Sequence, residues 1–248
     1  MAESSVAESR TEQWASELEH QSAPEILAWA ARFAPRVAFG TGFGAEGCVL
    51  VHLIATEALP IRVFTLDTGL LFPETYELWQ RLERRYGIAI RGVQPALSLE
   101  EQTAKYGDAL WEREPDRCCG IRKVAPLQPE IAGVDAWITA IRRDQTPDRA
   151  HAAILVREAV SGRLKINPLA TWTTDDVWEF IRANDVPYNP LYDRGYASIG
   201  CAPCTTAVTD GEHPRAGRWR GREKTECGLH VASGPVPLQL FPSSSQGA

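Results

Sequence analysis

Four cysteines of this chain stand in two pairs whose spacing could bind one metal centre. Cys118 and Cys119 are adjacent, whereas Cys201 and Cys204 form a C-x-x-C turn. A C-x-x-C turn directs two thiolates at one ion, and a second pair completes a tetrahedral zinc site. Adjacent side chains on a helix point about 100° apart, which suits the separate iron corners of a cubane cluster better than one zinc ion. Spacing alone ranks zinc first, an iron–sulfur cluster second and small buried unliganded residues third.

The other two cysteines differ in their surroundings. Cys227 lies in the sequence ECGLH, three residues before His230, which indicates a reactive thiol. Cys48 lies in an apolar run and is predicted to be a core residue. An unperturbed thiol has a pKa of about 8.5, so a nearby histidine or arginine that lowers this pKa would raise the thiolate fraction at neutral pH.

The composition limits the class of protein in which these thiols act. The 248 residues are 44% hydrophobic and 23% charged with a net charge of −6, which is typical of a globular chain with a sizeable core. This acidity argues against a nucleic-acid partner, no apolar run is long enough to span a membrane, and the polar start is not a secretory signal. Six cysteines without an export signal predict a reducing, cytoplasmic location and metal or catalytic roles in place of disulfides.

Short apolar strands alternate with helices along most of the chain. Residues 36–40 predict a buried strand, which the glycine-rich turn 41–46 and a helix to about residue 58 follow. This arrangement can place backbone N–H groups under a phosphate, although such turns also serve packing alone. A second strand at 61–66 ends at Asp67, which either meets a ligand at the sheet edge or caps a turn. Further strands are predicted at 88–93, 136–141, 154–156 and 164–166, the last two as a hairpin, with helices at 11–33 (broken at Pro24), 73–86 and 173–183.

Basic residues follow two of these elements. Arg142 and Arg143 come after the strand at 136–141, where they could clamp an anion or form a solvated cluster. The arginine-rich run at 215–222 could likewise bind a phosphate or form a solvated loop. The alternation of elements predicts one doubly wound α/β domain with a mostly parallel sheet over residues 11–230. Residues 1–10 are expected to be a disordered leader and residues 231–248 a disordered, flexible tail.

Eight collinear motifs resemble the assimilatory adenylyl-sulfate and phosphoadenylyl-sulfate reductases. They are LDTG at 66–69, the pair Cys118 and Cys119 followed by Arg122 and Lys123, WITAIRRDQ at 137–145, KINPL at 165–169, PYNPLYD at 187–193, SIGCAPC at 198–204, RAGRW at 215–219 and ECGLH at 226–230. The resemblance implies the fold of the adenine-nucleotide α-hydrolases and ATP pyrophosphatases. Because both cysteine pairs are present, it also implies the iron–sulfur kind of this family, with a 4Fe-4S cluster on Cys118, Cys119, Cys201 and Cys204 in place of zinc.

The same resemblance implies a reaction. Adenylyl sulfate (APS) would be reduced to sulfite and AMP in assimilatory sulfate reduction, through an S-sulfonate on Cys227 with His230 nearby. Thioredoxin, or a glutaredoxin-like protein, would supply the electrons, and the cluster would act structurally and electrostatically through Lys123. The implied substrate-binding residues are Thr41, Gly42, Phe43, Gly44, Leu66, Asp67, Thr68, Gly69, Lys123, Arg142, Arg143, Arg215 and Arg218. The sequence leaves open whether the chain forms a homo-oligomer.

Three alternatives remain at this point. The chain could reduce the 3′-phosphorylated substrate (PAPS), it could be an ATP pyrophosphatase that adenylates its substrate, or it could be a metal-containing sensor that binds nucleic acid. The turn at 41–46 lacks the lysine and the serine-rich character of an ATP loop, and the acidic balance opposes the sensor. Gly47 departs from the family pattern, which often has Asp there.

Overall fold

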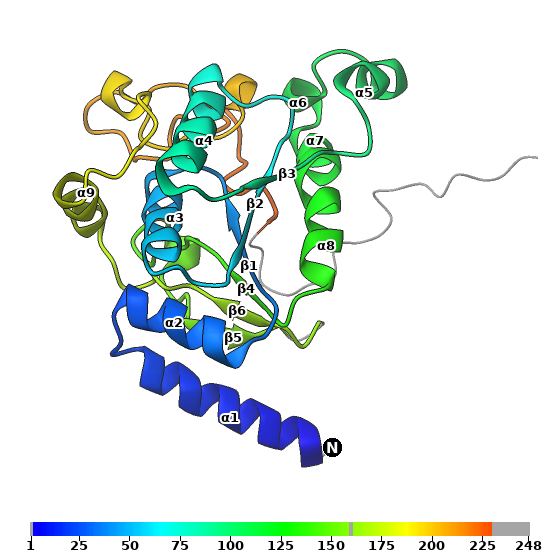
Figure 1. The fold of residues 1–248 in the computed structure, drawn as a ribbon. Helices are drawn as coiled ribbons and strands as arrows, with labels where there is room; N and C mark the ends of the chain where they lie inside the picture. The colour runs from blue at the N-terminus through cyan, green and yellow to red at the C-terminus, as the bar shows by residue number, and fades with distance from the viewer. Residues whose placement is uncertain (1, 159–160, 230–248) are drawn as a thin grey trace, which may run out of the picture.

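The computed structural model describes residues 2–158 and 161–229, with side chains from residue 10 onward. Within these residues the chain forms a six-stranded sheet in the order β3-β2-β1-β4-β6-β5 (Figure 1). Its strands are β1 (Val37–Thr41), β2 (Arg62–Leu66), β3 (Arg91–Val93), β4 (Ala136–Ile138), β5 (Leu155–Arg157) and β6 (Leu164–Ile166). The four pairings from β3 to β6 are parallel, and β5 pairs antiparallel with β6. The predicted doubly wound, mostly parallel sheet and the predicted hairpin are therefore confirmed.

Strand β1 lies at the point where the strand order reverses. It pairs with β2 on one side, with Thr41 opposite Thr65, and with β4 on the other, with Phe39 opposite Ile138. The chain winds outward from β1 to β3 and then crosses to the opposite side at β4. In open α/β sheets, ligands bind beside the carboxyl ends of the strands at such a switch point.

Helices cover both faces of the sheet (Figure 1). The larger core lies on the face covered by α2 (Ala23–Phe33), α3 (Ala45–Thr56), α4 (Pro73–Tyr86) and α9 (Thr174–Ala183). On the opposite face, Leu127 and Ile131 of α8 (Ala125–Ala132) pack against Phe64 and Trp137. Helix α7 (Pro115–Cys119) and the π-helical turn η1 (Gly120–Val124) lead directly into α8, so the cysteine pair stands at the top of this layer.

Local signals predicted several helix boundaries correctly. Ser22 precedes α2 and Thr173 precedes α9, and both form capping boxes. Pro73 opens α4, and Gly87 ends it with a φ of 64°, a left-handed conformation that costs glycine little. The segment at 95–116 contains the short helices α5 (Leu99–Tyr106) and α6 (Leu110–Arg113). Three short 3₁₀ turns complete the described elements: η2 (Pro147–Arg149), η3 (Tyr192–Arg194) and η4 (Ala202–Cys204).

The expected disordered leader at residues 1–10 was wrong for the part that the structure describes. Helix α1 runs from Ala2 to Leu18 and lies against β5. Alanine and glutamate, of which the leader contains two each, are strong helix formers, so the leader extends the helix that follows. Trp14 of α1 packs edge-on against Trp29 of α2, with ring centroids 5.5 Å apart.

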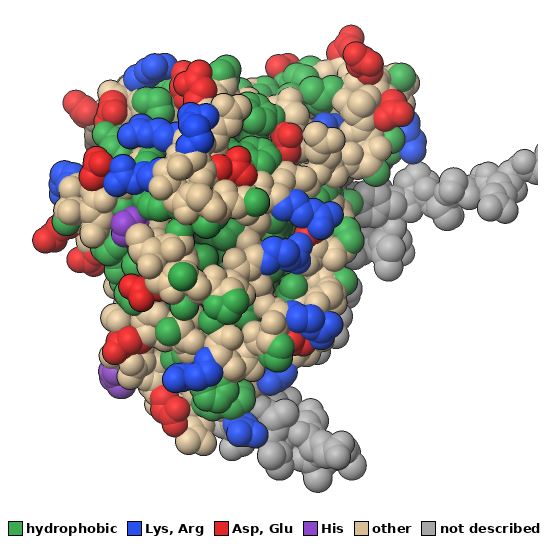
Figure 2. Space-filling model, viewed as in Figure 1, with side chains coloured by type: hydrophobic (Ala, Val, Ile, Leu, Met, Phe, Trp, Pro, Cys, Tyr) green, Lys and Arg blue, Asp and Glu red, His purple; other side chains and the backbone are tan. Residues whose placement is uncertain are grey.

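The face in Figure 2 carries basic and acidic side chains interspersed with apolar ones. No helix in the described part of the chain is both long enough and apolar enough to cross a lipid bilayer.

Candidate functional site

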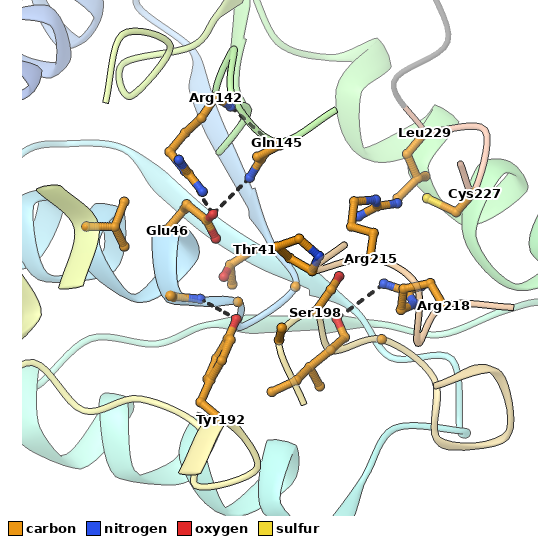
Figure 3. Close-up of a pocket in the computed structure, with 18 of the residues that line it drawn as sticks. Thr41, Glu46, Arg142, Gln145, Tyr192, Ser198, Arg215, Arg218, Cys227 and Leu229 are labelled. Atoms are coloured by element: carbon orange, nitrogen blue, oxygen red, sulfur yellow. Dashed lines mark hydrogen bonds and ion pairs between the residues drawn. The ribbon is translucent and has the colours of Figure 1, made fainter. Parts of the chain in front are cut away.

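A cavity of about 880 Å³ opens where β1 and β2 end and the chain leaves β4 (Figure 3). The predicted metal ligand Cys201 lines it, and so do ten of the predicted substrate-binding and catalytic residues: Thr41, Gly42, Gly44, Leu66, Thr68, Lys123, Arg142, Arg215, Arg218 and Cys227. The other predicted substrate residues, Phe43, Asp67, Gly69 and Arg143, do not line it. His230 lies outside the residues that the structure describes.

The β1–α3 turn presents fewer amide donors to the cavity than its glycines suggested. The Phe43 N–H donates to Thr41 Oγ1 at 3.1 Å, and the Ala45 N–H donates to Tyr192 Oη at 2.9 Å. The Phe43 backbone is left-handed, with a φ of 57°, which turns its ring into the core onto Trp79. The Phe43 ring is therefore turned away from the cavity, and Phe43 as a substrate contact stays a prediction.

Glu46 adds a negative charge to the cavity wall at the start of α3. It is paired with Arg142 at 3.0 Å and accepts a hydrogen bond from Gln145 Nε2 at 2.9 Å (Figure 3). Arg142 is buried and also pairs with Asp144 and donates to Thr174 Oγ1. A guanidinium with all these partners holds the wall together.

The second predicted arginine of this pair points away from the cavity. Arg143 forms a two-pronged ion pair with Glu19 of the segment after α1 and donates to the Ala152 carbonyl. Its side chain links the segment after α1 to the sheet and lies outside the cavity wall, so its role in substrate binding stays a prediction. Strand β4 ends at Ile138, so the irregular course of the chain after it decides that only one of the two arginines reaches the cavity.

The turn after β2 divides its residues between two roles. Leu66 and Thr68 line the cavity, and the Thr68 hydroxyl lies 3.4 Å from the sulfur of Cys201. Asp67 accepts hydrogen bonds from the Gly69 N–H at 3.1 Å and the Tyr76 hydroxyl at 2.7 Å. Of the two roles that the sequence left open for Asp67, the structure therefore shows the turn cap.

Cations gather at the side of the cavity nearest the cysteines. Lys123 and Arg218 both line it, and neither pairs with a carboxylate among the described residues. Burial opposes the charge on Lys123, yet the nearby Cys201 and Cys227 raise its pKa to about 12. The Arg218 guanidinium lies over the ring of Trp219, 4.5 Å from its centroid, and the Arg218 Nε is buried without a partner in this part of the chain. These two cations are therefore available to an anionic ligand.

The segment that carries Cys227 lies along the same side (Figure 3). Cys227 itself is half-buried, and its neighbour Glu226 pairs with Arg149 at 2.8 Å and with Arg215 at 3.4 Å. Two residues later, Leu229 packs against the core beneath α8. Apolar anchors are few in this segment, as the sequence indicates, and ionic contacts supply the rest.

The four paired cysteines surround a second, much smaller cavity of about 10 Å³. Burial and the other three thiols raise the pKa of Cys118 to about 12, and burial raises that of Cys119 to about 11. Cys201 behaves differently: burial opposes ionisation, but Lys123, Thr68 and Arg218 together lower its pKa. Among the described residues, no three histidine, cysteine or carboxylate side chains converge as ligands of a single metal ion.

Comparison with known proteins gives the family. Residues 36–207 match the family model described as the phosphoadenosine phosphosulfate reductase domain. The chain belongs to that reductase family. A curated relative from Geobacillus kaustophilus, named adenosine 5′-phosphosulfate reductase, is 45% identical over 219 residues, 88% of this chain and 93% of the relative. The resemblance inferred from the motifs is confirmed.

Solved structures agree with this family. The phosphoadenylyl-sulfate reductase of Candida auris, solved as a phosphate complex, is 33% identical and covers 80% of this chain and 96% of its own, with a TM-score of 0.71. The FMN adenylyltransferase of Candida glabrata is 15% identical over 88% of this chain and 76% of its own, with a TM-score of 0.52. The second likeness shows the nucleotide-binding fold alone.

Within this reductase fold, sequence reasoning missed many residues of the cavity wall, among them the polar side chains of Glu46, Gln145, Arg149 and Tyr192. Gln145 and Tyr192 belong to motifs that carry the family resemblance, so membership of those motifs was the available signal. Arg149 lies in the turn η2, in a stretch with no strand or helix pattern. Its partner Glu226 is 77 residues away, and such a pairing leaves no local trace in the sequence.

Proposed function

We propose that this chain reduces APS to sulfite and AMP with electrons from a thioredoxin-like dithiol. The observation that carries the proposal is that the Cys227 thiol lines the same cavity as the cations Lys123 and Arg218, at the nucleotide-binding edge of the sheet. The family and the name of the Geobacillus relative, which specifies adenosine 5′-phosphosulfate, also support it.

The two sides of the cavity suit the two parts of this substrate. The side near β1 and α9 offers aromatic and hydroxyl groups from Trp178, Tyr192 and Thr41, which can contact a nucleoside. The opposite side offers Lys123 and Arg218 beside the thiol. A sulfate group held there would have its charge neutralised by those cations, which lowers the barrier to the approach of a thiolate.

The proposed reaction has two steps. The Cys227 thiolate attacks the sulfate sulfur, so that a sulfur–sulfur bond forms, the sulfur–oxygen bond breaks, and its electron pair leaves with AMP. One thiol of thioredoxin, or of a glutaredoxin-like protein, then attacks the Cys227 sulfur and expels sulfite. The second thiol of that reductant resolves the mixed disulfide, which returns Cys227 to its thiol form. His230 remains a proposed proton partner on the strength of its place in the motif.

A 4Fe-4S cluster is the cofactor that the four paired cysteines fit. They approach one small cavity from two segments far apart in sequence, and two of them are adjacent on a helical run. Buried indole N–H groups of Trp111 and Trp219, unpartnered among the described residues, also line that cavity. When bound, the cluster would supply structural cross-linking and a negative charge beside Lys123, which lines both cavities.

We place this reaction in the cytoplasm, because all six cysteines are free and the proposed chemistry needs reduced thiols. A metal assay tests the cofactor. Protein purified without oxygen should be brown and contain iron and acid-labile sulfide in equal amounts. Stoichiometric zinc without sulfide would contradict the proposal.

A sulfite-release assay with thioredoxin tests the substrate. APS should be strongly preferred over PAPS in kcat/KM. A preference for PAPS would favour the activity that the name of the Candida auris relative specifies.

A mass measurement tests the nucleophile. Incubation with APS but without thioredoxin should add one sulfonate to the peptide that contains Cys227. The Cys227→Ser variant should bind APS and keep its iron, yet form no S-sulfonate and release no sulfite. Cys48 is fully buried, so Cys48→Ala is the matched thiol control and should retain the label on Cys227. Label on Cys48, or turnover by Cys227→Ser, would place the nucleophile elsewhere.

A further inference from the structure

A continuous chain of polar contacts crosses the cavity from the β1–α3 turn to the Cys227 segment. Arg142 pairs with Glu46, and Glu46 accepts from Gln145 Nε2 at 2.9 Å. Gln145 Oε1 then accepts from Arg149 at 2.5 Å, and Arg149 pairs with Glu226. The final contact is the one in this series that reaches the segment carrying Cys227.

Glu226 holds that contact with both carboxylate oxygens. Arg149 Nε donates to Oε1 at 3.0 Å and Arg149 Nη2 donates to Oε2 at 2.8 Å, the parallel geometry that gives arginine–carboxylate pairs their strength. Arg215 Nη2 lies 3.4 Å from the same Oε2. The side chains of Arg149, Glu226 and Arg215 are 13%, 19% and 18% exposed, so water and salt screen this bridge less than they screen a surface pair.

The bridge is placed where it can set the position of the thiol. Glu226 is the residue before Cys227, and Leu229, two residues after it, packs into the core beneath α8. Between these two anchors stand only Cys227 and Gly228, whose φ of 84° turns the chain. The thiol therefore lies between an ionic anchor before it and an apolar anchor after it. Arg215 also donates to the Thr225 carbonyl at 2.8 Å and Lys224 pairs with Asp116, so loss of the Glu226 carboxylate would weaken the anchor next to the thiol, because it removes the two-pronged contact with Arg149.

We infer that Glu226 is a positioning residue, which holds Cys227 in the cavity by bridging Arg149 and Arg215. This inference rests on the proposed function, because it assigns Glu226 to the sulfonation step. Lys123 and Arg218, which have no carboxylate partner in the described chain, are left to bind the sulfate group. Glu226 therefore orders the thiol without taking part in the bond changes.

Hydrogen exchange in the substrate-free protein tests the anchoring directly. In Glu226→Gln the backbone amides of residues 223–229 should exchange at least about tenfold faster than in the wild type, which corresponds to loss of about 1.4 kcal/mol of local stability. Glu226→Asp keeps the charge and should recover part of the protection. Glu223 is exposed on the same segment, so Glu223→Gln is the matched control and should leave exchange unchanged.

Single-turnover sulfonation by APS tests the consequence. Glu226→Gln should form the Cys227 S-sulfonate about tenfold more slowly, with the KM for APS and the iron content unchanged. Equal exchange in Glu226→Gln and wild type, or the same acceleration in Glu223→Gln, would overturn the inference. A raised KM with an unchanged sulfonation rate would also overturn it, because the bridge would then serve binding. Failure of the wild type to form any S-sulfonate would instead refute the proposed function. The hydrogen-exchange comparison would still show whether Glu226 anchors the segment that carries Cys227.

Discussion

Gly47 is the position at which a single methyl group should disturb the β1–α3 turn. A Cβ atom built on Gly47 would lie 2.7 Å from Thr41 Oγ1, closer than real side chains approach. Thr41 has little room to move, because it is buried and its hydroxyl accepts the Phe43 N–H at 3.1 Å. Gly47→Ala would therefore force the end of β1 and the start of α3 apart.

Two opposing terms set the size of this effect. Alanine in place of glycine inside a helix is worth about 0.5–1 kcal/mol of stability. Overpacking a closely packed site costs about 1–3 kcal/mol. The net loss in the free energy of unfolding should be about 1 kcal/mol, which lowers the Tm of a domain of this size by about 2–4 °C.

A double-mutant cycle measured by urea unfolding isolates the contact. Thr41→Ala removes Oγ1 and leaves Cβ, which is 3.8 Å from the added methyl, an ordinary contact distance. In that background Gly47→Ala should no longer destabilise, which gives a coupling energy of about 1–3 kcal/mol. Gly133, with a φ of −92° and no atom within 4 Å of its added Cβ, supplies the control, and Gly133→Ala should be neutral or slightly stabilising. Equal stabilisation by Gly47→Ala in both backgrounds would refute the reasoning.

Three further predictions concern charge, pH and the cofactor. Arg143→Gln should leave the KM for APS within about twofold. It should lower the free energy of unfolding by less than about 1 kcal/mol, because the ion pair of Arg143 with Glu19 is partly exposed. A large rise in KM would show that Arg143 does contact the substrate. Burial, with help from Arg85, lowers the pKa of His52 in the folded protein. Above about pH 6.5 the ring is neutral in both the folded and the unfolded chain, whereas below that pH the unfolded chain binds the proton first, so the free energy of unfolding falls as the pH falls. His52→Gln should therefore flatten the decline in urea-unfolding free energy between pH 7.5 and 5.5, and an unchanged slope would count against this assignment. Chelation of iron under anaerobic conditions should lower the Tm of the wild type, whereas an equal Tm with and without iron would show that the cysteine segments hold together unaided.

The parts of the fold that the sequence predicted are those set by local chemistry. The bounds of α4 follow from Pro73 and Gly87, and the cap of α9 follows from Thr173, since each signal lies within the element that it ends. The sheet edge as the ligand site follows from alternating strands and helices, which dictate where carboxyl ends gather.

The parts that it did not predict depend on side-chain direction and on distant partners. Arg142 and Arg143 are chemically identical, and only the three-dimensional course after β4 decides that one meets Glu46 and the other Glu19. Phe43 appears in a turn that favours ligands, but its left-handed backbone sends the ring into the core. The pairing of Arg149 with Glu226 joins segments with no periodic pattern to connect them.

Helix α1 has a consequence for solubility. Strand β5 forms one edge of the sheet, and such an edge presents unpaired backbone groups that can recruit another chain. Helix α1 lies against this strand, where Arg157 of β5 donates to Thr11 at 3.2 Å. A protein that begins at residue 19 would keep its cavity and its cysteines but expose both β5 and the face of Trp29 that Trp14 covers. Removal of helix α1 should therefore first increase the amount of protein in the insoluble fraction. The truncated protein that stays in solution should keep its turnover number.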